Sequence, residues 1–219
     1  MSQRDTFLVS EGDAYFNRNA SKLGKEVLEE EAVWIDVLQQ HLAERSRILE
    51  IGCATGVNLE RLRRLKGCLG AGVEPSPAAV KAGKDQFPDL DLRVGTADAL
   101  PFPDASFDCV LFGCCLYLVD RASLPKVVAE ADRVLKDKGR LAIIDFDPDA
   151  PVVREYIHAP GMLSHKMDYA GMFTGFPQYS LIEKRSFAHH GQHFNPDPSQ
   201  RVAIQVLYKD TGQGYGLPR

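Results

Sequence analysis

The stretch at residues 47–62 constrains the fold more than any other part of the chain. An apolar run, R-I-L-E-I, is followed by a short turn that contains Gly52 and Gly56. Leu59 and Leu62 then recur at helical spacing, so the pattern predicts a strand, a tight turn and an amphipathic helix. This is half of a nucleotide-binding βαβ unit. The two glycines let the backbone approach a ligand, and the helix N-terminus offers it unpaired N–H groups.

The same stretch argues against a dinucleotide ligand. The NAD fingerprint G-x-G-x-x-G would require glycine at positions that hold Ala54 and Val57. Glu50, at the carboxyl end of the strand, would repel a pyrophosphate and suits a cation instead. An NAD-dependent oxidoreductase is therefore a disfavoured alternative.

Three acidic residues each follow or end a predicted strand. Glu50 ends the first, Glu74 ends the strand expected at 67–74, and Asp98 follows the strand expected at 90–94. Doubly wound folds place an acid at about the position of Glu74 to accept hydrogen bonds from ribose hydroxyls. The carboxyl ends of parallel strands share one crevice, so we expect the three acids to bind a ligand with an ammonium, a diol and an adenine amine.

These residues carry a family resemblance. E-I-G-C-A-T-G at 50–56 is similar to motif I of the class I S-adenosylmethionine-dependent methyltransferases, with Ala54 in place of the usual middle glycine. F-G-C-C-L-Y at 112–117 resembles motif IV, which would lie beside the transferable methyl group. L-K-D-K-G-R-L at 135–141 matches the turn before the fifth strand, so the resemblance covers residues 47–146. It implies S-adenosylmethionine as cofactor and S-adenosylhomocysteine as product.

The resemblance also implies a set of cofactor-binding residues. Glu50 would face the ammonium of the methionine part, and Arg18 would pair with its carboxylate. Arg18 belongs to residues 1–24, which the resemblance marks as an N-terminal arm or lid; composition alone favours a solvated arm. The expected cofactor-binding residues are Tyr15, Arg18, Glu50, Gly52, Cys53, Ala54, Gly56, Glu74, Pro75, Ser76, Ala97, Asp98, Ala99, Phe112, Gly113, Cys114 and Tyr117.

The implied fold is α/β: a doubly wound, seven-stranded, mostly parallel, Rossmann-like sheet with helices on both faces. A C-terminal antiparallel hairpin, from strands at 179–187 and 201–208, would close it. Helices are expected at 25–44 and from Ser123 to a stop at residues 138–139. We expect one methyltransferase domain over 1–219, with loop and short-helix structure at 147–178 forming the acceptor region.

The chemistry expected of the acceptor region is modest. A sulfonium already activates its methyl group, so the protein mainly aligns the acceptor and excludes water. Some acceptors also need a general base, for which His165, with Tyr169 beside it, is the candidate. Cys114 or Cys115 as a thiol nucleophile lacks an adjacent histidine or lysine.

The remaining histidines, composition and charge bound the partners. A metal is not expected at His189, His190 and His193, which lie in a Gly-containing loop without a carboxylate in helical register. The net charge of −4, with dispersed basic residues, argues against nucleic acid. No apolar run reaches the roughly 18 residues of a membrane span, and the N-terminus lacks a signal-peptide core, so a cytoplasmic protein is expected.

We therefore expect a monomer or homodimer that methylates an oxygen, nitrogen or carbon of a small molecule, either a natural product or a sugar-like metabolite. A catalytically silent, cofactor-binding partner subunit is the alternative within the same fold.

Overall fold

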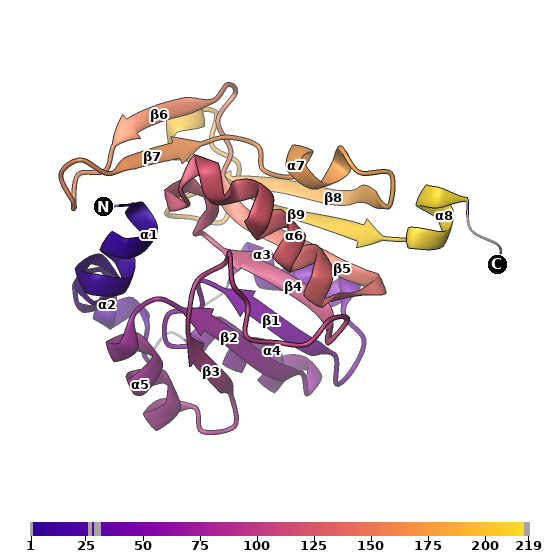
Figure 1. Cartoon of the computed structure of the whole chain (residues 1–219), viewed down its shortest axis with the longest axis horizontal. Helices are drawn as coiled ribbons and strands as arrows, with labels where there is room; N and C mark the ends of the chain where they lie inside the picture. The colour runs from indigo at the N-terminus through magenta and orange to yellow at the C-terminus, as the bar shows by residue number, and fades with distance from the viewer. Residues whose placement is uncertain (1, 26–27, 29–31, 217–219) are drawn as a thin grey trace.

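The computed structural model describes residues 2–25, 28 and 32–216, and its centre is a seven-stranded sheet (Figure 1). The strand order is β3-β2-β1-β4-β5-β9-β8. The neighbouring pairs among β1 to β5 are parallel, whereas β9 runs antiparallel to both β5 and β8. The expected mostly parallel sheet with a C-terminal antiparallel hairpin is confirmed. The strands are β1 Arg47–Ile51, β2 Leu69–Glu74, β3 Asp91–Val94, β4 Phe107–Gly113, β5 Leu135–Phe146, β8 Tyr179–Ala188 and β9 Arg201–Lys209.

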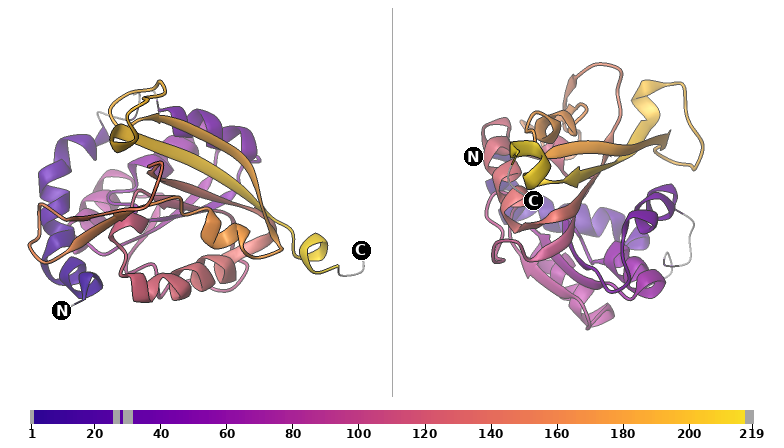
Figure 2. Two further views of the ribbon diagram at one scale, coloured as in Figure 1. Left: turned by 90° about the horizontal axis from the view of Figure 1, so that it is seen from above. Right: turned by 90° about the vertical axis from the view of Figure 1, so that its right-hand side faces the viewer.

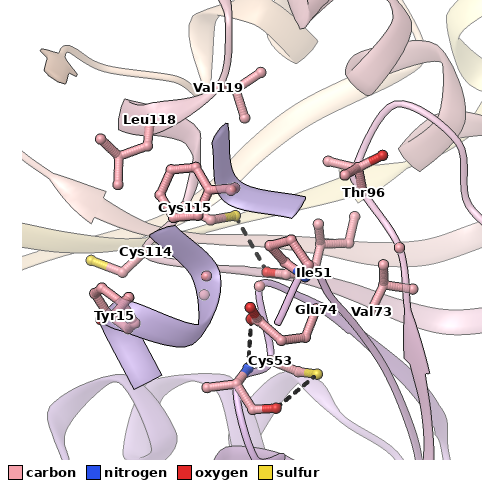
Figure 3. A pocket seen from close by; sticks show the side chains of 18 of the residues that line it. Tyr15, Ile51, Cys53, Val73, Glu74, Thr96, Cys114, Cys115, Leu118 and Val119 are labelled. Carbon is pink, nitrogen blue, oxygen red and sulfur yellow. Dashed lines mark hydrogen bonds between the residues drawn. The ribbon is translucent and has the colours of Figure 1, made fainter. Parts of the chain in front are cut away.

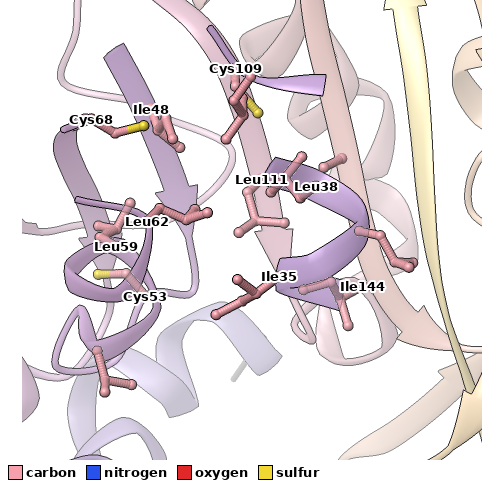
Figure 4. Close-up of a cluster of buried hydrophobic side chains, with 14 of the residues drawn as sticks. Ile35, Leu38, Ile48, Cys53, Leu59, Leu62, Cys68, Cys109, Leu111 and Ile144 are labelled. Atoms are coloured by element: carbon pink, nitrogen blue, oxygen red, sulfur yellow. The ribbon is translucent and has the colours of Figure 1, made fainter. Parts of the chain in front are cut away.

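One face of the sheet is covered by α3 (Val33–Leu38), α4 (Val57–Lys66) and α5 (Pro77–Gln86). Figure 4 shows Leu38 of α3 and Leu59 of α4 among the buried side chains that pack against Ile48 and Leu111 of the central strands. Strands β1 and β4 are buried over nearly their whole length, as parallel strands with both faces covered should be. This packing fixes the strand ends that build the site.

The opposite face is covered mainly by α6 (Leu124–Val134) and by the short helix α7 (Gly171–Thr174). Val127 and Ala131 of α6 and Phe173 of α7 belong to the buried cluster on that face. Figure 2 shows both helices from two further directions. Helices on both faces, as expected, leave only the sheet edges and strand ends open.

The boundaries of two expected helices were wrong. The helix expected at 25–44 is described only as Val33–Leu38 with a 3-10 turn after it, because Ala32 is extended; residues 26–27 and 29–31 lie outside the described part. Helix α6 ends at Val134 rather than at residues 138–139, because Leu135 already pairs with Phe107 of β4. The register of the β4–β5 pair shifts between Phe107, which pairs with Leu135, and Cys109, which pairs with Arg140.

The region 147–178 contains a hairpin that the sequence did not suggest. Strands β6 (Val152–Glu155) and β7 (Leu163–Lys166) form a separate two-stranded sheet above the main one. The hairpin lies next to the N-terminal helices (Figure 1), where Gln3 accepts a hydrogen bond from the Leu163 N–H at 2.7 Å. The expected loop region is therefore partly a sheet that packs on the N-terminal segment.

The remaining described elements are short. They are α1 Gln3–Thr6, the π-helical turn Phe7–Glu11, α2 Gly12–Asn19, α8 Thr211–Tyr215, and 3-10 turns at Ala20–Lys22, Gln39–His41, Leu116–Leu118, Arg121–Ser123 and Pro198–Gln200. Within the described ranges, no helix is both long and apolar enough to cross a bilayer.

Candidate cofactor site

A cavity of about 310 Å³ opens at the carboxyl ends of β1, β2 and β4. Its volume falls at the lower end of the roughly 300–1,000 Å³ typical of small-molecule sites. Ile51 and Gly52 form the β1 side, Val73 and Glu74 the β2 side, and Gly113 the β4 side. Figure 3 shows side chains of these strand ends together with Tyr15 from α2. The topology thus brings the turn after β1, the end of β2 with Glu74 and the end of β4 to one place.

The turn after β1 supplies the floor of the cavity. Gly52 and Gly56 have φ of +76° and +81°, which glycine adopts without strain. A Cβ at Gly52 would lie 2.8 Å from the Cys115 Cβ, so only glycine fits at this close approach. Ala54 also has a left-handed φ, +47°. The backbone of the turn therefore keeps the conformation that glycine would adopt, and Ala54 is strained because its side chain disfavours a left-handed φ.

Glu50 lies directly beneath this floor. Its side chain is fully buried; Asn58 Nδ2 donates to Oε1 at 2.7 Å, and Oε2 has no partner among the described residues. A Cβ on Gly113, which lines the cavity, would meet Oε1 at 2.6 Å. Burial raises the pKa of Glu50 to about 8. The charge of Glu74 also raises this pKa, whereas the hydrogen bond from Asn58 lowers it. The site therefore holds a buried carboxyl group whose charge lacks a counter-ion.

Glu74 lies in the cavity wall and is itself held by the turn. Its Oε2 accepts a hydrogen bond from Ala54 N, and its Oε1 accepts one from Ser76 N, both at 3.0 Å. Burial raises the pKa of Glu74 to about 7, although both hydrogen bonds lower it. The carboxylate retains lone pairs that can accept hydroxyl donors such as a ribose diol.

Asp98 lines the opposite end of the cavity and already has a cationic partner. Arg4 Nε donates to Asp98 Oδ1 at 3.1 Å, and Thr96 Oγ1 donates to the same oxygen at 2.7 Å. Burial alone would raise the pKa of Asp98, but these two partners lower it. Arg4 thus places the N-terminal helix over the end of the cavity expected to take the adenine.

The N-terminal segment covers the cavity through several further contacts. The N–H groups of Gln3 and Arg4 donate to the Asp120 carboxylate at 3.1 and 2.9 Å. Asp13 of α2 accepts hydrogen bonds from the Ser76 hydroxyl and, at 3.1 Å, from Ala78 N. These contacts tie the segment to the loops after β2 and β4, a geometry suited to the lid expected of residues 1–24.

Eleven of the expected cofactor residues line the cavity. They are Tyr15, Gly52, Cys53, Ala54, Glu74, Pro75, Ala97, Asp98, Gly113, Cys114 and Tyr117. Burial raises the pKa of Tyr15 to about 12 and also raises those of Cys114 and Cys115, so burial keeps these thiols protonated. This argues against the thiol nucleophile considered from the sequence.

Six expected cofactor residues do not line the cavity. Besides Glu50 beneath the floor, Gly56 supports the turn and Ser76 caps α5 from a fully buried position. Phe112 is buried in the core against Phe173, because alternation along β4 directs it away from the cavity. Ala99 is exposed beyond the cavity.

Arg18 also lies elsewhere. Its guanidinium pairs with the buried carboxylate of Glu11 and donates to the Tyr156 hydroxyl at 3.3 Å. Tyr156 donates in turn to Glu11 at 3.1 Å. Arg18 therefore joins α2 to the β6–β7 hairpin instead of facing the cavity, because Glu11 satisfies its charge.

The two candidates for a general base lie outside the cavity as well. Tyr169 is buried; its hydroxyl donates to the His165 carbonyl and accepts from Arg121 Nη1 at 2.8 Å. Burial raises its pKa to about 12. His165 sits on β7, where burial and the charge of Arg121 lower its pKa. Neither lines the wall near Gly113, where the resemblance places the transferable methyl group.

Several lining residues were not expected from the sequence. Asn58 contacts both the cavity and Glu50, and its place two residues after Gly56 in the first helical turn was a usable signal. Trp34 lines the cavity too. Arg4 and Asp120 come from segments with no recognisable motif. Only the tertiary fold brings Arg4 and Asp120 to the cavity.

Comparisons with known proteins find similarity to methyltransferases. A family model described as "Methyltransferase domain" matches residues 49–143. The demethylmenaquinone methyltransferase of Tropheryma whipplei is 32% identical over 117 residues, which cover 50% of this chain and 47% of the relative. A ubiquinone/menaquinone biosynthesis C-methyltransferase of Citrifermentans bemidjiense is 31% identical over 147 residues, 62% of this chain and 60% of the relative. The chain spans about half the length of the curated relatives it matches first.

One solved structure shows how far the fold likeness extends. It is the Burkholderia thailandensis 1,6-didemethyltoxoflavin-N1-methyltransferase with bound 1,6-didemethyltoxoflavin and S-adenosylhomocysteine. The TM-score is 0.66 with 16% identity, over 91% of this chain and 87% of that one. At this identity the likeness concerns the fold, and it extends well beyond residues 49–143.

Proposed function

We propose that the chain is a class I S-adenosylmethionine-dependent methyltransferase and that it transfers a methyl group from S-adenosylmethionine to a small organic acceptor. The family model over residues 49–143 and the curated relatives support this proposal. The acceptor class is proposed from the relatives, which are named for demethylmenaquinone and 1,6-didemethyltoxoflavin. A natural-product acceptor fits these names better than a sugar.

The observation that carries the proposal is the unpaired Glu50 carboxyl under the cavity floor. A buried charge without a partner is costly, and the pKa of about 8 reflects that cost. A ligand that brings a positive charge to Gly113 and Asn58 would remove it. S-adenosylmethionine carries such a charge on its ammonium, whereas a pyrophosphate would add negative charge beside Glu50 and Glu74, which disfavours NAD.

Three acidic residues would bind the polar groups of this cofactor. Glu50, through its neighbour Asn58, would complement the ammonium, Glu74 would accept the ribose hydroxyls, and Asp98 would accept the adenine amine once Arg4 yields. The backbone of Gly52 and Gly113 permits close approach. When bound, the cofactor supplies a methyl group on a sulfonium, already activated for displacement.

The protein's own part in the reaction is alignment and exclusion of water. The contacts of Gln3, Arg4 and Asp13 with the loops after β2 and β4 would hold the N-terminal segment over the cavity as a lid. Tyr15, Cys114 and Tyr117 form its wall, and burial raises the pKa of each. None of these three groups is suited to remove a proton near pH 7, so the wall that they form supplies no general base.

The test is turnover by the purified chain. Incubation with S-adenosylmethionine and a panel of quinols and heteroaromatic ring compounds should yield S-adenosylhomocysteine together with an acceptor heavier by one methyl group, both detected by mass spectrometry. A chain that binds the cofactor but transfers nothing to any acceptor would contradict the proposal and favour a silent partner subunit.

A further inference from the structure

A series of aromatic rings leads from the cavity wall to the surface. Tyr117, which lines the cavity, packs against Phe146 at the end of β5 with ring centroids 5.0 Å apart. Phe146 lies 5.4 Å from the ring of His189, which is 4.3 Å from that of His190. The rings come from three separate segments and meet edge-to-face or tilted, so the fold assembles a chain of aromatic contacts that begins at the cavity wall.

Lys166 of β7 reaches onto this wall. Its Nζ lies 3.5 Å from the centroid of the Phe146 ring, a cation–π contact. The side chain is half-buried, and no carboxylate in the described part of the chain lies within ion-pair distance of it. The carboxyl group that influences its pKa, Asp145, lies near the end of β5 and is buried. Lys166 is thus a lysine near the cavity without a described ion-pair partner.

Other basic groups influence Lys166 and His189. Arg154 lies on β6, the strand that pairs with β7, and burial and its charge lower the pKa of Lys166. Burial and the charges of His190, Lys166 and Lys22 lower that of His189. Because like charges repel, an anion bound beside Lys166 would relieve this repulsion in addition to the charge of the buried Asp145.

We propose that Lys166, on the face of Phe146, is the anion-binding subsite for the methyl acceptor, and that the acceptor is a planar molecule with a carboxylate, phenolate or enolate group. The proposal rests on the proposed function, because it places the acceptor beside the cofactor cavity. Tyr117, which lines the cavity and meets Phe146 edge-on, would contact the acceptor ring, and Lys166, held on the face of Phe146, would bind its negative oxygen. Selection for an ionised acceptor also agrees with the lack of a suitable base at Tyr15, Cys114 and Tyr117.

The experiment compares two probes that differ only in charge. 2-Naphthoate is planar and anionic, and 2-naphthamide is its neutral counterpart. Each is titrated calorimetrically into the chain saturated with S-adenosylhomocysteine. A charge-assisted contact predicts that naphthoate binds about tenfold more tightly than naphthamide.

Three variants identify the source of that preference. Lys166→Met should abolish it while leaving the affinity for naphthamide and for S-adenosylhomocysteine unchanged, which also shows that the variant is folded. Lys166→Arg should retain it. The matched control is Lys81→Gln on α5, because Lys81 is exposed and pairs only with Asp85 there; this variant should behave like the wild type.

Results that contradict the anion-binding subsite differ from results that contradict the proposed function. Equal affinity of the two probes for the wild type, no binding of either, or a preference that survives in Lys166→Met would overturn the subsite. Failure of S-adenosylhomocysteine to bind the wild type would instead contradict the cofactor assignment, and the naphthoate preference can still be measured on the chain alone.

Discussion

Replacement of Glu50 by glutamine should affect stability and cofactor binding in opposite directions. Burial raises the pKa of Glu50 to about 8 in the folded chain, from an ordinary value of 4.5. Because the folded-state pKa is raised, the stabilisation is complete below about pH 4.5 and is lost as the pH rises through about 8. At about 1.4 kcal/mol per pKa unit, Glu50 should cost the wild type about 3 kcal/mol of unfolding free energy between roughly pH 5 and pH 8.

Glutamine cannot ionise, so the Glu50→Gln variant should lose about 3 kcal/mol less than the wild type over the same range. Urea unfolding of both proteins without ligand, at the two pH values, measures this difference. The amide also removes the negative charge that would complement an ammonium. A hydrogen bond to a charged group contributes roughly 1.5–3 kcal/mol, so the affinity for S-adenosylmethionine should fall about 10- to 100-fold in calorimetry.

Glu60 provides the matched control for this prediction. It is a buried glutamate on α4 that pairs with Arg63 and Arg64 outside the cavity. Burial alone would raise the pKa of Glu60, but the two arginines lower it below its ordinary value. Glu60→Gln should therefore not reproduce the pH effect of Glu50→Gln and should leave cofactor affinity unchanged. Equal pH dependence in Glu50→Gln and wild type would refute the argument from burial, and equal cofactor affinity would refute the role of Glu50 as counter-charge.

Three further substitutions test the turn, the lid and the floor of the site. Ala54→Gly should relieve the left-handed φ of +47° and raise the unfolding free energy by up to about 1 kcal/mol in urea titrations; a loss of stability would show that the turn is unstrained. Arg4→Gln should free Asp98 and speed cofactor association several-fold in stopped-flow measurements, whereas a slower association would mean that Arg4 recruits the cofactor. Gly113→Ala would place a Cβ 2.6 Å from Glu50 Oε1 and should lower cofactor affinity by at least about tenfold, measured by calorimetry; wild-type affinity would contradict the close approach.

Local pattern was enough to predict the first strands and the three strand-end acids, whereas the seven-stranded sheet with its closing hairpin was implied by the family resemblance. The apolar runs that became β1, β2 and β4 are bounded by turn residues, and parallel strands necessarily bring Glu50, Glu74 and Asp98 to one end of the sheet. The glycine turn was equally local, since Gly52 and Gly56 are required by their own backbone angles. These features need no knowledge of distant contacts.

Contacts between distant segments could not be predicted in the same way. Arg18 was assigned to the cofactor because its charge suited a carboxylate, yet Glu11 is close enough to take that charge. The β6–β7 hairpin is short and exposes apolar as well as polar side chains, among them Val153 and Leu163, so it carries little periodic signal and depends on Tyr156 packing against the N-terminal segment. Both differences lie in segments that cover the site rather than in those that form its floor.

Calorimetric titration of the purified chain with S-adenosylmethionine, S-adenosylhomocysteine and NAD tests the central claim most directly. We expect saturable binding of the first two at one site per chain and no heat from NAD, because the carboxyl groups of Glu50 and Glu74 favour a cationic ligand and oppose a pyrophosphate. Absence of binding by both sulfur compounds, or equal binding of NAD, would contradict the assignment of this cavity.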